Sequence, residues 1–269
     1  MIRVTMRQVA ATMILAATAS LAPSFAGEAA APAKPYVSKP YTMPTKGIND
    51  AIKKAVQSPD RPADQVERDG WRRPAEILAL ANIKAGQRVV ELSPYGLYYS
   101  NLLSAAVGPK GTVHMYEFPH VAEHYGEANK AWAAQHPNVK YEVVDYGKIE
   151  FPRNVDVVFS SLVFHDMLLL NVDLDVFHDK LFKAMKPGAI YLVIDHAATH
   201  GTGTNDTGKF HRIDPAVIRA QVQAFGFELI EDSRLLENPQ DKHDWPVFED
   251  GKRDQTDQIV FKFRKPVVY

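Results

Sequence analysis

The chain has 269 residues, of which 46% are hydrophobic and 23% charged, and its formal net charge at pH 7 is −1. This length and balance fit one large α/β domain, or two small ones, with a buried core. A nucleic-acid partner is not expected, because no excess of Lys and Arg offsets phosphate charge. The absence of cysteine excludes disulfides, thiolate catalysis and cysteine metal ligands.

The N-terminus has the three parts of a secretory signal peptide. Arg3 and Arg7 form a short positive region, residues 9–22 form an apolar run, and the small residues Ser24 and Ala26 follow. An apolar run of about 14 residues is shorter than the roughly 20 that span a bilayer. We therefore expect cleavage after Ala26, export to the periplasm or beyond, and no membrane span in the mature chain.

The remaining chain divides into a short tether and one domain. Residues 27–47 are rich in Ala, Pro and Lys, which keeps the segment extended. Residues 48–269 are expected to form the domain, with a helical extension at its N-terminus. That extension has a helix at 49–57 and a second helix opened by Pro74, since proline is tolerated in the first helical turn.

From residue 88 onward, the pattern alternates between strands and helices. Seven strands are expected, at 88–92, 112–118, 139–144, 155–162, 189–195, 227–236 and 258–264. Four helices are expected between them, at 98–107, 121–135, 174–185 and 215–225. Such alternation predicts an α/β fold, with a mostly parallel sheet covered by helices on both faces. The last two strands are joined by a polar loop alone, so the last strand should be antiparallel.

Several strings distributed along this pattern carry a family resemblance. They are Arg72-Arg-Pro-Ala-Glu76, Val89-Val-Glu-Leu-Ser-Pro-Tyr-Gly-Leu-Tyr-Tyr99, Phe164-His-Asp166, Leu181-Phe-Lys-Ala-Met-Lys-Pro-Gly188, Val193-Ile-Asp-His196 and His211-Arg-Ile-Asp-Pro215. Over roughly residues 60–266 the chain resembles class I S-adenosylmethionine-dependent methyltransferases, in particular a bacterial group of predicted methyltransferases that often carry signal peptides. The resemblance implies a Rossmann-like fold, S-adenosylmethionine as cofactor, and methyl transfer to a small molecule or an exported substrate.

The resemblance also implies a cofactor site at the carboxyl ends of the strands, where open α/β sheets bind ligands. Glu91 ends the first strand and precedes the turn that faces the methionine portion of the cofactor. Glu117 ends the second strand, where an acid accepts bonds from the ribose hydroxyls. Asp145 ends the third strand and would bond the adenine amine.

The turn after the first strand departs from the family pattern, which is acidic-x-Gly-x-Gly-x-Gly. Counted from Glu91, the glycine positions hold Ser93, Tyr95 and Leu97, and Gly96 lies between them. Glycine permits unusual backbone angles and a close approach of ligand, and the tyrosine and leucine at these positions are expected to supply neither. If Tyr95 points into the cofactor pocket, we expect S-adenosylmethionine to bind weakly or not at all.

Histidine and aspartate gather at the same edge of the predicted sheet. His165 and Asp166 follow the fourth strand, and Asp195 and His196 end the fifth. These four are the candidate catalytic residues. His165 could act as a base, because the pKa of histidine lies near neutrality, and Asp195 could orient an imidazole.

Other interpretations of the histidines remain open. His196 and His211 could simply hold the loop that follows the fifth strand, in which His200 also lies. A metal-dependent hydrolase using His165, His196 and His211 is a further alternative, although no metal ligand is assigned. The chain could also be a non-catalytic ligand-binding protein on a methyltransferase scaffold. The acceptor molecule and the oligomeric state do not follow from the sequence.

Two long loops are expected to cover the site, because loops of this length in compact domains often form lids or binding loops. The first, at 197–213, is rich in Gly and Thr. The second, at 237–257, carries Trp245 and Phe248, which could cap a substrate.

Overall fold

The computed structural model describes residues 36–267. The predicted signal peptide and the first part of the tether lie outside these residues. Within them, no helix is both long and apolar enough to cross a membrane.

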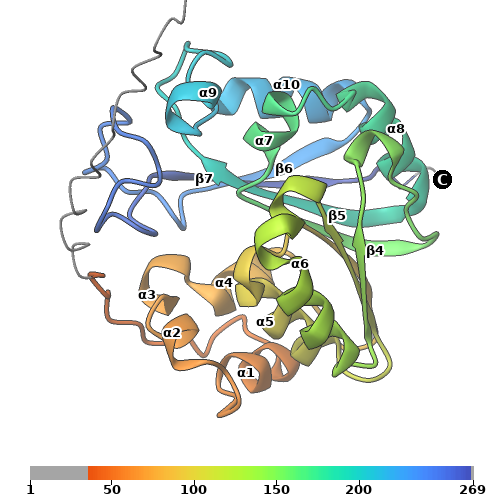
Figure 1. The fold of residues 1–269 in the computed structure, drawn as a ribbon. Coiled ribbons are helices and arrows are strands. Elements are labelled where there is room, and N and C mark those ends of the chain that lie inside the picture. The colour runs from red at the N-terminus through yellow and green to blue at the C-terminus, as the bar shows by residue number, and fades with distance from the viewer. Residues whose placement is uncertain (1–35, 268–269) are drawn as a thin grey trace, which may run out of the picture. The chain divides into compact units, whose positions relative to one another are not determined.

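A seven-stranded sheet forms the centre of the domain (Figure 1). Its strands are β1 (Arg88–Leu92), β2 (Thr112–Glu117), β3 (Val139–Val143), β4 (Val155–Ser161), β5 (Met185–His196), β6 (Glu228–Ser233) and β7 (Gln258–Arg264). The strand order is β3-β2-β1-β4-β5-β7-β6, and β7 is antiparallel to both of its neighbours. The predicted Rossmann-like sheet with an antiparallel last strand is therefore confirmed.

Helices cover both faces of the sheet. Figure 1 shows α1 (Asp50–Val56), α4 (Pro74–Leu80) and α5 (Tyr98–Val107) on one face, and α7 (Phe164–Leu169), α8 (Leu174–Ala184) and α10 (Pro215–Ala224) on the other. The helix α6 (Pro119–Ala134) packs against β2 and β3. Shorter helical segments complete the described part: α2 (Ala63–Val66), α3 (Asp69–Arg72), η1 (Tyr95–Leu97), η2 (Tyr146–Lys148) and α9 (Thr207–Phe210).

The core consists of two apolar layers, one on each face of the sheet. Successive strand residues enter opposite layers, because side chains alternate along a strand. Tyr191 belongs to the layer beneath α7, α8 and α10, whereas Leu192 belongs to the layer beneath α1, α4 and α5. Both side chains are fully buried. The sheet is thus buried on both faces, which explains its long apolar runs.

The end of the predicted tether packs against the helical extension. The indole nitrogen of Trp71 donates to the carbonyl of Val37 at 2.9 Å. The hydroxyl of Tyr41 donates to Glu76 at 2.7 Å. Residues 36–47 therefore follow the surface of the domain, although their composition is typical of a linker.

The largest departure from the expected elements follows β4. No helix was expected directly after the fourth strand, but His165 and Asp166 lie in the first turn of α7. The helix forms because Phe164 and Met167, three residues apart, both pack into the core. This short helix holds both candidate residues in a defined orientation at the edge of the sheet.

Candidate functional site

A cavity of about 520 Å³ lies at the carboxyl ends of β1, β4 and β5. Glu91 enters it from β1, His165 from α7 directly after β4, and His196 from the end of β5. The predicted convergence of these three strand ends is therefore present. Residues 247–251, together with further positions of the same loop, close the cavity, as was expected for the loop at 237–257.

His165 is held in place by a carboxylate behind it. Its ring nitrogen Nδ1 lies 2.6 Å from Asp195 Oδ1, and its backbone N–H donates to Asp195 Oδ2 at 2.9 Å. Asp195 is fully buried, so it orients the imidazole, as predicted, and does not line the cavity. Burial lowers the pKa of His165, but the carboxylates of Asp195 and Asp166 outweigh burial and raise the pKa to about 10.

The carboxylate of Asp166 lies next to three polar side chains. Its Oδ2 accepts a hydrogen bond from the hydroxyl of Tyr95 at 2.6 Å. Its Oδ1 lies 3.3 Å from His165 Nε2 and 3.6 Å from His211 Nδ1. Although burial raises the pKa of Asp166, these neighbours hold it well below its usual range. The loop at 197–213 thus contributes His211 beside the cavity, and none of its residues lines the cavity itself.

The other two histidines of the sequence prediction occupy different positions. His196 lines the cavity, and its Nδ1 lies 2.7 Å from the hydroxyl oxygen of Thr256. Burial and the cationic His165 keep the pKa of His196 well below its ordinary value, so the ring stays neutral. His200 is exposed and lies 3.5 Å from Asp214. It therefore takes no part in the cluster.

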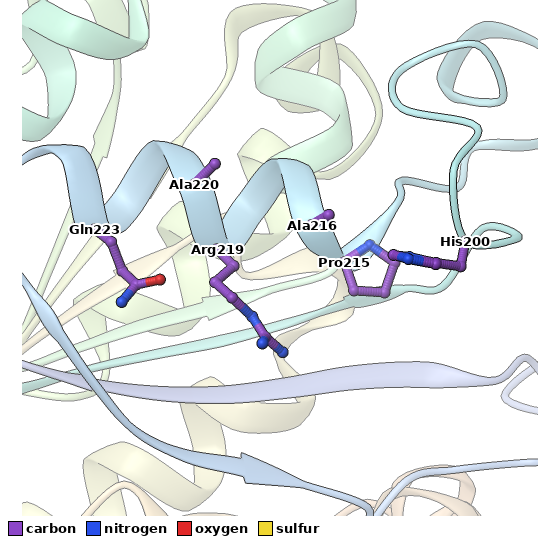
Figure 2. Close-up of a pocket in the computed structure, with 6 residues that line it drawn as sticks. All are labelled: His200, Pro215, Ala216, Arg219, Ala220 and Gln223. Carbon is purple, nitrogen blue, oxygen red and sulfur yellow. The ribbon is translucent and has the colours of Figure 1, made fainter.

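His200 borders a separate hollow of about 330 Å³ along α10, shown in Figure 2. Pro215, Ala216 and Ala220 are among the residues that line it, and the guanidinium of Arg219 is paired with Asp232 at 2.6 Å. No residue lines both this hollow and the cavity at His165. The hollow holds no group of catalytic character apart from the exposed ring of His200.

Glu91 is the most unusual acid in the cavity. The residue is 2% exposed, and its Oε2 has no hydrogen-bond partner in the described part of the chain. Burial raises the pKa of Glu91 to about 8, and the nearby carboxylate of Glu117 adds to the effect, while the hydroxyl of Ser100 opposes it. The side chain therefore keeps its proton near neutral pH and can donate it.

Sequence reasoning missed a charged cluster on the opposite side of the cavity. Arg68 donates two hydrogen bonds to Asp254, at 2.7 and 2.8 Å, and Arg72 donates a third at 3.0 Å. The guanidinium of Arg72 also lies 4.5 Å from the ring centre of Tyr98. Arg72 opens one of the strings quoted for the resemblance, but nothing in the polar loop around Asp254 indicated this contact. The cluster ties the helical extension to the loop that closes the cavity.

The turn after β1 adopts the backbone angles expected of a glycine-rich turn, although it has one glycine. Ser93 and Leu97 have φ values of 56° and 63°, and Gly96 has 66°. Only glycine adopts this left-handed region without steric cost. The expectation that Leu97 would not supply such angles is therefore wrong, because packing around the turn imposes them.

Tyr95 reaches across from this turn to α7, through its bond to Asp166. Its ring therefore bridges the ends of β1 and β4, where the methionine portion of S-adenosylmethionine was expected. Tyr95 also lines the cavity, together with Ser93 and Gly96 of the same turn.

The residues expected to bind the adenosyl portion are also engaged with the chain itself. Glu117 is fully buried, accepting hydrogen bonds from Ser93 Oγ at 2.9 Å and Asn129 Nδ2 at 3.3 Å. Burial raises the pKa of Glu117 to about 7. Asp145 points away, since its half-exposed carboxylate accepts a bond from the backbone of Gly147 and caps η2. Neither acid lines the cavity.

An aromatic side chain, Tyr146, follows Asp145 and packs into the core. The ring of Tyr146 stacks on Phe118 with 3.8 Å between ring centres, and its hydroxyl donates to the carbonyl of Tyr116 at 2.8 Å. Tyr146 is fully buried. The residues to which the resemblance assigns the adenosyl portion of the cofactor are therefore hydrogen-bonded within the chain.

Comparison with known proteins identifies the fold. No protein-family profile and no curated protein sequence matches the chain. Among solved structures, a SAM dependent methyltransferase from Aquifex aeolicus is 21% identical, with a TM-score of 0.52 over 80% of this chain and 98% of that one. A putative sarcosine dimethylglycine methyltransferase from Galdieria sulphuraria is 13% identical, with a TM-score of 0.54 over 81% and 99%.

A third similar structure is named as a cyclase. This protein, SpnF, is 16% identical, with a TM-score of 0.54 over 79% of this chain and 86% of its own. Together these likenesses show that the chain has the class I methyltransferase fold. A fold of this kind hosts more than one chemistry, so function has to be argued from the site.

Proposed function

We propose that this chain is an enzyme that acts by acid–base catalysis on a small organic molecule, using a methyltransferase scaffold. The observation that carries the proposal is that residues expected to hold the cofactor are engaged within the chain while a cavity stays open beside them. Tyr95 is bonded to Asp166, and Glu117 accepts hydrogen bonds from Ser93 and Asn129. The cavity is lined by His165 and by Glu91, whose buried Oε2 has no hydrogen-bond partner among the described residues.

Glu91 is the proton donor in this proposal. A buried carboxyl group that stays protonated near neutral pH can donate to a leaving group or a developing oxyanion. His165 is the second functional group, since it lines the cavity and Asp195 fixes its ring through Nδ1. Proton transfer by a positioned side chain contributes roughly 10²- to 10⁴-fold in rate.

The walls of the cavity favour an aromatic substrate. Five aromatic side chains line it, and two of the three arginines that also line it, Arg68 and Arg72, are engaged by Asp254. The aromatic residues are Tyr95, Tyr98, Tyr99, Tyr125 and Phe248. Largely apolar pockets with a few polar groups are typical of small-molecule sites. Esters and amides of small aromatic compounds are therefore the first molecules to screen for turnover.

Methyl transfer from S-adenosylmethionine is the second candidate function. It is favoured by the fold and by the position of His165, directly after the fourth strand, where the resemblance implies a base facing the substrate. It requires Tyr95 to leave Asp166 and Tyr146 to leave Phe118. The acceptor would be a small molecule or, given the predicted export, a substrate outside the cytoplasm.

Calorimetric titration with S-adenosylmethionine and S-adenosylhomocysteine separates the two candidates. We expect no binding to the wild type or to Tyr95→Phe, which keeps the ring, and measurable binding to Tyr95→Gly, which opens space beside Ser93. Micromolar binding to the wild type that is lost in Glu117→Gln would favour methyl transfer and contradict our proposal.

Turnover gives the positive test. For any aromatic ester or amide that the wild type converts, Glu91→Gln should lower kcat/KM by about 100-fold or more. The matched control is Glu127→Gln, an exposed acid on α6, which should leave the rate unchanged. Equal rates in Glu91→Gln and the wild type would remove Glu91 from the mechanism.

A further inference from the structure

His165, Asp166 and His211 come together from two separate segments of the chain. Each offers one ligand atom, and the three atoms lie within 4.8 Å of one another. The atoms are His165 Nε2, a carboxylate oxygen of Asp166 and His211 Nδ1. The sequence alternative for a metal grouped His196 with the other two histidines, but His196 is engaged by Thr256 and Asp166 takes its place.

The spacing of these atoms matches the coordination sphere of an ion better than it matches hydrogen bonding. The distances from Asp166 Oδ1 to the two imidazole nitrogens, 3.3 and 3.6 Å, exceed an ordinary N–H···O bond. Two ligand atoms held about 2.1 Å from one ion at tetrahedral or octahedral angles lie roughly 3.0 to 3.4 Å apart. The two distances to Asp166 are therefore close to those of a coordination sphere, and the two imidazole nitrogens lie within 4.8 Å of each other.

Each imidazole turns one nitrogen toward Asp166. Asp195 holds the proton on His165 Nδ1, so Nε2, 3.3 Å from Asp166, is the nitrogen that a metal would bind by displacing its proton. A carboxylate behind a histidine is the usual support of a metal-binding imidazole. On the other ligand, His211 Nδ1 is buried and has no hydrogen-bond partner among the residues that the structure describes.

The backbone of His211 is held in an unfavourable conformation that points its ring at the cluster. Its φ is 53°, in the left-handed region that costs free energy for a residue with a side chain. The adjacent Arg212 anchors it, because Arg212 is fully buried and paired with Asp241 at 2.8 Å. Phe248 packs on the ring of His211 with 4.9 Å between ring centres. Such strain is retained where the surrounding structure requires one geometry.

We propose that His165, Asp166 and His211 form a binding site for one divalent transition-metal ion of the Mn²⁺ to Zn²⁺ series. Two imidazoles and one carboxylate are ligands that these ions prefer, whereas Mg²⁺ and Ca²⁺ prefer oxygen alone. Three protein ligands leave coordination positions open, which is characteristic of catalytic rather than structural sites. A metal bound here supplies a Lewis acid and lowers the pKa of a bound water. Metal binding at this site does not depend on the proposed function; only a catalytic use of the metal rests on it.

Metal titration of the purified protein, prepared without a polyhistidine tag and stripped with a chelator, tests the site. We expect Zn²⁺ and Co²⁺ each to bind with a stoichiometry of one, and Co²⁺ to give visible absorption bands of nitrogen and oxygen ligation. His211→Ala and Asp166→Asn should weaken binding by at least 100-fold, and the supporting change Asp195→Asn by 10- to 100-fold. His200→Ala, which removes an exposed imidazole outside the cluster, is the matched control and should bind as the wild type does.

Folding is checked on the same samples. Zn²⁺ should raise the melting temperature of the wild type and of His200→Ala, but not that of His211→Ala or the milder His211→Gln. Binding that is absent, or that survives both His211→Ala and Asp166→Asn, would overturn the metal site. The two proposals can fail separately: no metal binding with turnover that depends on Glu91 would overturn the metal site alone, whereas metal binding with turnover unaffected by Glu91→Gln would overturn the role of Glu91 alone.

Discussion

Replacing Glu91 with glutamine should change how the stability of the protein depends on pH. The pKa of this carboxyl rises from 4.5 to about 8 in the folded chain because the group is buried. The folded chain therefore binds this proton more tightly than the unfolded chain does. Between pH 4.5 and 8 the folded state holds more protons, so stability must fall as the pH rises through this interval.

The size of the effect follows from the two pKa values. At about 1.36 kcal/mol per pH unit, the difference between 4.5 and about 8 corresponds to a loss of about 5 kcal/mol above pH 8. Glutamine has nearly the same shape and no charge to bury. Glu91→Gln should match the wild type near pH 4.5 and be more stable by several kcal/mol at pH 9. A smaller decline should remain in the variant, because the pKa of Glu117 is also raised, to about 7.

Urea unfolding at pH 5, 7 and 9, followed by circular dichroism, measures the difference in the free energy of unfolding. The exposed Glu127→Gln controls for the general effect of removing a surface charge. A Glu91→Gln variant that is equally stable or less stable than the wild type at pH 9 would refute the reasoning. The carboxylate of Glu91 would then be ionised at little cost, and its role as proton donor would fall with it.

Three further outcomes are expected. Gly70→Ala should destabilise the protein or detach the segment before the first helix, because a Cβ at position 70 would lie 1.8 Å from the carbonyl oxygen of Lys39; limited proteolysis would detect the loosened segment. Asp241→Asn should cost about 3 to 5 kcal/mol in urea unfolding, since it leaves the fully buried Arg212 without its counter-charge, and a cost below about 1 kcal/mol would contradict this. Mass spectrometry of the exported protein should give a chain that begins near Gly27, and a chain that still begins at Met1 would exclude cleavage.

Local patterns in the sequence were enough to predict the sheet. Strand and helix alternate with clear boundaries, and right-handed crossovers leave few ways to arrange seven such strands. The same rules brought Glu91, His165 and His196 to one edge, because the carboxyl ends of parallel strands point the same way. Asp195 was expected to orient an imidazole for the same reason, and it contacts His165.

The direction and environment of single side chains could not be read from these patterns. Glu117 and Asp145 lie at the ends of their strands, as predicted. Glu117, however, is buried and hydrogen-bonded to Ser93 and Asn129, and Asp145 caps a helical turn. Asp254 reaches Arg68 across 186 positions of the chain. The periodicity of hydrophobic residues gives no information on contacts between residues so far apart in the sequence.

The sequence by itself determined the class of fold, the edge of the sheet at which ligands would bind and the residue types gathered there, because these follow from periodicity, chain order and the handedness of connections. Tertiary structure decided which of those residues face the cavity. Tyr95 connects the turn after β1 to α7, and Tyr146 stacks on Phe118. His211, with its unfavourable backbone conformation, lies beside Asp166. These positions depend on packing between distant segments, where the volume and hydrogen bonding of a few side chains determine which space is filled and which is left open.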